Sequence, residues 1–264
     1  MSNLSKQLFA SVGSHFVTMS CVRRSKDTQE SEVVVFSGFL IEVLNVWFWI
    51  TAGHIYRNLQ TKISEGYVFD VWRLDDQTAG NEFNGAAIPF DFEPSKWVVV
   101  ENEDIGLDYA AVYLHPFFCR QLEAGNARPI PKSAWKDHTL DSDQWALLGM
   151  PDESVTWDKR RLITGRVTVL PIAPTEPPPG AGKRANNQFY ARLTDLGTVS
   201  DVSGMSGGPV FSLKKVGDEW RYHVIGVQAG WYPSQGIIAA CPFSLFALEL
   251  TLLVQSAMED SPDE

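Results

Sequence analysis

The sequence contains only three cysteines in 264 residues, Cys21, Cys119 and Cys241, and they are widely spaced. An odd number of widely spaced cysteines gives no disulfide framework, which favours a reducing compartment and predicts a cytoplasmic protein. Neither the cysteines nor the five histidines occur at the spacings of a metal site. We therefore expect no structural zinc and no cofactor.

Long apolar runs and positive charge are also scarce. No stretch has the length of a membrane span, and the first ten residues lack the sustained apolar core of a signal peptide, so we expect neither a membrane association nor a leader. The 22 basic residues are outnumbered by 32 acidic ones, which gives a formal net charge of −10. Nucleic-acid binding requires a basic face, so nucleic acid is not an expected partner.

What the sequence does contain is a series of short segments rich in β-branched and aromatic residues, which are typical of strands. The first group comprises residues 15–23, 32–43, 46–51, 67–74, 97–101 and 109–114, with a further short strand within 86–89. The second group comprises residues 144–149, 160–170, 188–193, 208–213 and 220–229. Glycine, asparagine and proline in residues 125–136 indicate a linker between the groups, and residues 171–187 are expected to form an exposed loop. Apolar residues at helical spacing predict a helix over residues 244–258.

The most informative motif is Gly-Met-Ser-Gly-Gly-Pro at residues 204–209. Glycines on both sides of Ser206 allow a tight turn that exposes the hydroxyl beside backbone N–H groups, as an acyl-transfer nucleophile requires. The motif also fits the nucleophile elbow of α/β-hydrolases. That fold needs an acid and then a histidine downstream of the serine, but only His223 follows, and residues 209–213 resemble a strand instead of a helix.

Two upstream motifs complete a different order, which is histidine, aspartate, serine. His54 ends the segment Thr-Ala-Gly-His directly after an apolar strand, and Asp108 is followed at once by the apolar run 109–114. In this order the three motifs resemble those of the chymotrypsin-like (trypsin-like) serine peptidases, particularly a bacterial or intracellular type with a single peptidase domain.

The resemblance implies an all-β fold of two six-stranded antiparallel Greek-key β-barrels packed together, with a C-terminal α-helix. Residues 1–124 would form the barrel that carries the histidine and the aspartate. Residues 125–243 would form the barrel that carries the serine and the specificity pocket, and residues 244–264 the helix and an acidic tail.

The resemblance also implies the roles of the residues. Ser206 would attack a peptide carbonyl, His54 would act as the general base, and Asp108 would fix the imidazole tautomer. The N–H groups of Gly204 and Ser206 would form the oxyanion hole. The expected function is that of a trypsin-like serine endopeptidase that acts on a protein or peptide through an acyl-enzyme.

A second aspartate, Asp104, competes for the role of the acid. The run after Asp104 is interrupted by Gly106 and a second charge, whereas the run after Asp108 continues through residues 109–114. An acid that leads directly into a core strand favours Asp108.

The residues that the resemblance implies for substrate binding are Ser200, Asp201, Gln228, Ala229, Gly230 and Gly236. Ser200 and Asp201 would lie at the pocket floor. If Asp201 points inward, a basic side chain is preferred before the scissile bond; if Ser200 does, a larger apolar one is preferred.

The sequence departs from the family at Met205, where secreted members carry an aspartate that pairs with the new N-terminus after zymogen cleavage. Met205 cannot form that ion pair, so the loop must be held by packing or by an activating partner. Two alternatives therefore stay open: a binding protein with a peptidase fold and little or no turnover, and an esterase on the same scaffold.

Overall fold

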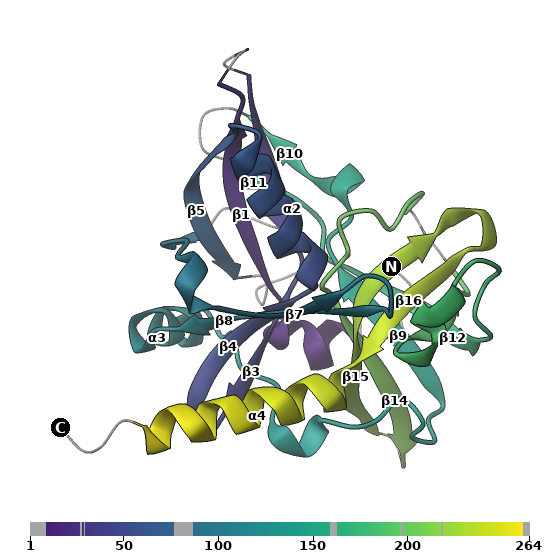
Figure 1. Ribbon diagram of the computed structural model, residues 1–264. Helices are drawn as coiled ribbons and strands as arrows, with labels where there is room; N and C mark the ends of the chain where they lie inside the picture. Colours follow the sequence, from purple (N-terminus) through teal and green to yellow (C-terminus); the bar gives the residue numbers. More distant parts are fainter. Residues whose placement is uncertain are drawn as a thin grey trace.

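The chain forms two β-rich halves with a long helix across one side (Figure 1). The computed structural model describes residues 9–26, 28, 30–76, 87–158, 163–195, 197, 199–217 and 219–260. Among these residues, no helix is both long and apolar enough to span a bilayer.

The first half contains two four-stranded antiparallel sheets. The first has the order β2 (Ser31–Phe36), β1 (Val17–Arg24), β5 (Val68–Asp76) and β6 (Ala87–Pro89). The second has the order β3 (Phe39–Val43), β4 (Val46–Thr51), β8 (Leu107–Leu114) and β7 (Trp97–Asn102). The predicted strand 32–43 is therefore divided between two sheets, and the chain passes from one sheet to the other at Ser37 and Gly38.

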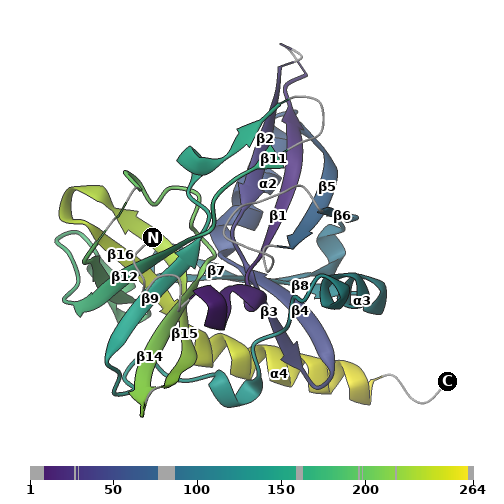
Figure 2. The same cartoon turned by 180° about the vertical axis from the view of Figure 1, so that it is seen from behind.

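The second half is a closed six-stranded barrel. Its strands, in order around the barrel, are β12 (Thr168–Thr175), β13 (Phe189–Leu193), β16 (Ile237–Pro242), β15 (Glu219–Tyr232), β14 (Pro209–Val216) and β9 (Gln144–Gly149). A two-stranded hairpin of β10 (Thr156–Trp157) and β11 (Ile163–Thr164) lies beside the first half (Figure 2). The expected architecture of antiparallel β-structure with a C-terminal helix is confirmed. Among the described residues, the closed six-stranded barrel is formed by this half.

Strand β12 differs from the prediction, because it begins later and extends into the segment expected to be a loop. Pro171 pairs with Ala146 of β9, and Pro174 pairs with Ala191 of β13. Each proline thus has a ladder partner on one side only, where a missing N–H group can be tolerated.

Three helices of nine or more residues complete the described fold: α2 (Gly53–Ser64), α3 (Pro116–Ala124) and α4 (Phe243–Glu259). Helix α4 contacts β15 and β3, and Phe246 stacks on Tyr109 of β8 with 4.8 Å between ring centroids. A continuous apolar core joins Phe39 and Ile50 of the first half to Leu148 and Phe211 of the second. A packed apolar interface therefore holds the two halves together.

Candidate active site

Two neighbouring strands bring His54 and Asp108 together. Strand β4 consists of aromatic and β-branched residues, which favour strands. Helix α2 begins after Ala52, and His54 is its second residue. Asp108 is the second residue of β8, which pairs antiparallel with β4 in the register Thr51↔Ala110. Since the carboxyl end of one antiparallel strand adjoins the amino end of its partner, both side chains lie at the same sheet edge.

Asp108 holds His54 through two hydrogen bonds, one to its backbone N–H and one to its imidazole. The backbone N–H of His54 donates to Oδ1 of Asp108 at 2.6 Å, and Nδ1 of His54 lies 2.7 Å from Oδ2. A carboxylate accepts hydrogen bonds, so the network assigns the proton to Nδ1 and leaves Nε2 as the free base. Asp108 is buried, whereas the alternative acid, Asp104, is exposed in the turn before β8.

Ser206 lies in the tight loop that leads into β14. The flanking residues Gly204 and Gly207 have φ values of +85° and +86°, which a side chain would strain. Ser206, Gly204 and His54 line one cavity of about 520 Å³. The structure thus places the predicted nucleophile and base on a common cleft.

The N–H groups of Gly204 and Ser206 have no hydrogen-bond partner among the described residues. The carbonyl group of each peptide is anchored, because Asp152 N donates to Ser203 O at 2.8 Å and Gly208 N donates to Met205 O at 2.9 Å. In a trans peptide the N–H points away from the C=O. The two anchored peptides therefore present free donors, as an oxyanion hole requires.

Met205 is fully buried in the core of the second barrel. A Cβ atom on Gly149 would lie 2.8 Å from Cβ of Met205, so the backbone of β9 packs directly against this side chain. An aspartate at this position could make an ion pair with a chain terminus. Here apolar packing occupies the site instead.

The scan against protein-family models and the search of curated proteins find no match. Among solved structures, the chain is similar to the scabies mite inactivated protease paralogue S-D1, with a TM-score of 0.52 and 11% identity over 93% of this chain and 94% of that one. It also resembles a thermostable serine protease, AL20, from an extremophilic microorganism, with a TM-score of 0.48 and 14% identity over 91% of this chain and 95% of that one. The Rv3671c protease from M. tuberculosis aligns with a TM-score of 0.46 and 14% identity over 92% of this chain and 82% of that one.

The chain has a chymotrypsin-like fold. At these identities the likeness concerns the fold alone, and the chemistry depends on the residues of the site.

In this chymotrypsin-like fold, Asp152 is a cleft residue that the sequence did not single out. It lines the same cavity as His54 and Ser206, and a Cβ atom on Gly204 would lie 2.2 Å from its Oδ1. Burial, together with the charge of Asp201, raises the pKa of Asp152 above its ordinary value. The sequence signal that could have identified Asp152 was its position directly after Gly-Met-Pro, whose glycine is the last residue of β9.

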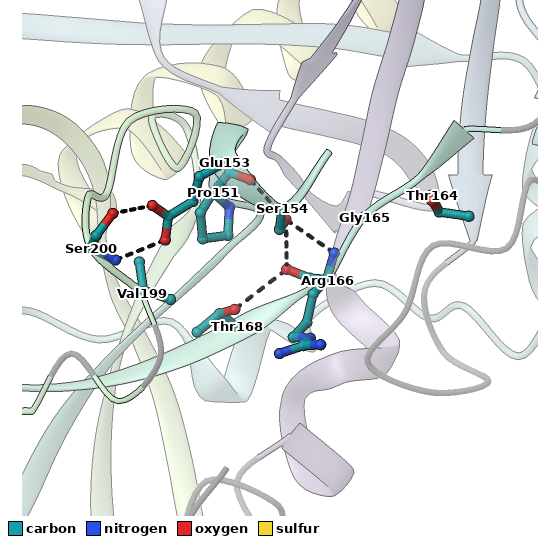
Figure 3. A pocket seen from close by; sticks show the side chains of 9 residues that line it. All are labelled: Pro151, Glu153, Ser154, Thr164, Gly165, Arg166, Thr168, Val199 and Ser200. Carbon is teal, nitrogen blue, oxygen red and sulfur yellow. Dashed lines mark hydrogen bonds between the residues drawn. The ribbon is translucent and has the colours of Figure 1, made fainter. Parts of the chain in front are cut away.

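Ser200 faces a separate polar cavity of about 600 Å³ (Figure 3). Its N–H donates to Oε1 of Glu153 at 2.7 Å, and its hydroxyl donates to Oε2, so these bonds lower the pKa of Glu153. Ser154 and Arg166 line the same cavity and hydrogen-bond to each other. Ser200 therefore does not line the described cavity that contains Ser206.

Of the remaining predicted pocket residues, Asp201 lies half-buried in the segment before Ser206, and the others lie along β15 and before β16. The side chain of Gln228 is buried, and its Nε2 donates to Gly230 O at 2.9 Å. Its backbone carbonyl accepts from Gly207 N at 2.8 Å and its N–H donates to Gly208 O at 2.9 Å, so β15 is bonded to the residues that follow Ser206. Ala229 lines a small cavity on the other side of His54. Gly236 has a φ of +63° in the turn before β16, with open space around the position of a Cβ atom.

The turn that leads to Asp108 is held by the second half of the fold. Asn187 Nδ2 donates to Ile105 O at 2.7 Å, and Gln188 Nε2 donates to Gly106 O at 3.1 Å. The position of the acid thus depends on side chains about 80 residues further along the chain.

Proposed function

We propose that this protein is a serine endopeptidase that cleaves peptide bonds through Ser206, His54 and Asp108. The observation that supports this most is that the His54–Asp108 pair shares a cleft with Ser206, while the N–H groups of Gly204 and Ser206 have no partner in the described part of the chain. The fold does not carry the proposal, because one of its structural neighbours is named an inactivated protease paralogue.

In the proposed reaction, Nε2 of His54 takes the proton from the Ser206 hydroxyl as the oxygen attacks the substrate carbonyl carbon. The carbonyl oxygen becomes an oxyanion and accepts hydrogen bonds from the N–H groups of Gly204 and Ser206. Asp108 stabilises the imidazolium. His54 then gives the proton to the departing amine as the C–N bond breaks, and water releases the acyl group by the same steps in reverse.

Asp201 supports a trypsin-like preference for a basic residue before the scissile bond. It lies half-buried in the segment that leads to Ser206. The hydroxyl of Ser203 donates to Oδ2 of Asp201 at 2.8 Å, and this bond lowers the pKa of the carboxyl group. Asp201 is therefore anionic at neutral pH, as a partner for a cationic side chain must be, although it does not line the described cavity that His54 and Ser206 share.

A fluorophosphonate probe tests the activity, since it reacts only with an activated serine. We expect covalent labelling of Ser206 in the wild-type protein and none in Ser206→Ala. Ser200→Ala is the matched control, because it removes a serine hydroxyl that faces the neighbouring cavity, and it should label like the wild type. A folded wild-type protein that resists the probe would count against the proposal and favour a binding protein.

A peptide library tests the substrate class. Cleavage after arginine and lysine, weakened in Asp201→Asn, is the expected result. Turnover of esters without cleavage of any peptide would favour the esterase alternative.

A further inference from the structure

Three consecutive peptide groups shape the loop around the nucleophile. The first and third carry the N–H groups of Gly204 and Ser206, which no described residue accepts from, and backbone groups anchor their carbonyls. The middle peptide joins Gly204 to Met205. Its orientation sets the angle between the other two, and therefore whether both N–H groups converge on one oxyanion.

The carbonyl of this middle peptide is held by a side chain from the other half of the fold. The Ser37 hydroxyl donates to Gly204 O at 2.8 Å and accepts from Met150 N at 3.0 Å. The N–H of the same peptide donates to Val202 O at 3.1 Å. Ser37 therefore joins the loop around Ser206 to the segment after β9. In the sequence, Gly204 and Met150 are 167 and 113 residues away from Ser37.

Ser37 is itself fixed in position. It is fully buried at the junction of β2 and β3, and Thr51 Oγ1 donates to its carbonyl oxygen at 2.9 Å. A Cβ atom on Gly207 would lie 2.6 Å from that carbonyl oxygen, so the glycine after the nucleophile packs against the same group. A hydroxyl that is enclosed in this way has little freedom to rotate to other partners.

We propose that Ser37 is a positioning residue that holds the Gly204–Met205 peptide in the orientation needed for an oxyanion hole. This inference rests on the proposed function, because the hole has a use only if Ser206 is a nucleophile. With Met205 unable to make a terminal ion pair, the Ser37 hydroxyl supplies the polar contact that apolar packing lacks. The predicted consequence is a loss of transition-state stabilisation when the hydroxyl is removed.

The central variant is Ser37→Ala, which leaves Gly204 O and Met150 N without their buried partner. The matched control is Tyr222→Phe, which removes another hydrogen bond between the halves, from the Tyr222 hydroxyl to His15 Nε2 at 2.7 Å. Ser37→Cys keeps a weak donor of similar size and provides a second variant should the alanine protein fold poorly.

Two measurements separate positioning from stability. The first is amide hydrogen exchange of the peptide that contains Met205, which reports the loop whether or not the protein is active. We expect faster exchange of the Met205 amide in Ser37→Ala, an intermediate rate in Ser37→Cys, and the wild-type rate in Tyr222→Phe. The second is fluorophosphonate labelling with peptide kinetics, where we expect kcat to fall by about 10- to 100-fold in Ser37→Ala with KM little changed, less than the loss of a whole oxyanion donor.

The outcomes are distinguishable. Unchanged exchange of the Met205 amide in both Ser37 variants would overturn the inference, whatever the labelling rate. Equal effects in Tyr222→Phe would also overturn it, because they would show a merely structural role. A wild-type protein that is inert to the probe would refute the proposed function, and faster exchange in Ser37→Ala would still support the role of Ser37 in holding the loop.

Discussion

Replacement of Met205 by aspartate tests how the nucleophile loop is held. The substitution introduces the acid that secreted peptidases carry, but into a fully buried site packed against Gly149. The matched control is Met205→Ala, which removes the same packing without adding a charge. Truncation of a buried methionine costs about 2–5 kcal/mol of unfolding free energy.

The aspartate variant carries an additional penalty that depends on pH. A carboxyl group enclosed by apolar side chains stays protonated, so its folded-state pKa rises above the ordinary value of about 3.9. Each pKa unit corresponds to about 1.4 kcal/mol, so the extra loss relative to Met205→Ala is about 4 kcal/mol at pH 7 and about 1.5 kcal/mol at pH 5. Added to the loss from packing, this pH-dependent loss approaches the total unfolding free energy of about 5–15 kcal/mol that a domain usually has.

The assay is urea unfolding of both variants at pH 5, 6 and 7. We expect the gap between the aspartate and the alanine proteins to widen as the pH rises, because the unfolded chain releases a proton that the folded chain retains. Parallel curves with no pH-dependent gap would refute the reasoning. They would mean that the introduced carboxylate reaches water or a cation, and that packing of Met205 does not close the site.

Three further outcomes are expected. Asp108→Asn should slow labelling of the nucleophile by about 10⁴-fold, since the imidazole loses its fixed tautomer, while Asp104→Asn labels like the wild type. Burial lowers the pKa of His15. Its contribution to stability is therefore present above the ordinary pKa of about 6.5 and is lost as the pH falls from that value through the lower folded-state pKa. His15→Gln should weaken the pH dependence of the urea unfolding midpoint between pH 7 and pH 5. In the native protein a disulfide reagent at pH 8 should modify Cys119 before the other two thiols, which are fully buried, and all three should react after unfolding.

That His54, Asp108 and Ser206 lie near one another could be predicted from the sequence, because each lies at the end of a strand with a recognisable local pattern. Strands β4 and β8 have continuous apolar runs, and their pairing determines that His54 and Asp108 meet. The loop of Ser206 also had a local signal, because its backbone adopts positive φ values at positions 204 and 207, where the sequence has glycine.

Other elements had no such local signal. Helix α3 was not predicted, because it begins at a proline and its one buried residue is Leu122, so no apolar periodicity reveals it. Helix α2 extends through mostly polar residues to Ser64, and only Ile55 and Leu59 of its side chains are buried, so its length left little apolar pattern in the sequence. Prolines at 171 and 174 favoured a loop where β12 continues.

The contacts that hold the site were beyond local patterns altogether. Ser37 lies inside a segment that was expected to be one strand, and its partner Gly204 is 167 residues away. Asp152 acquires its place in the cleft only when the segment after β9 meets the nucleophile loop. Such contacts depend on how the halves dock, which no periodicity in the chain encodes.

The hydrogen bonds from Asn187 and Gln188 to residues 105 and 106 restrict how this molecule can be recombined. The acid belongs to one half, yet side chains of the other half hold the turn that aims it. A chimera that exchanges the second barrel for that of another chymotrypsin-like protein would keep His54 and Asp108 but lose these two donors. Successful exchange of halves therefore requires the segment around residues 187–188 to be transplanted together with the turn that it supports.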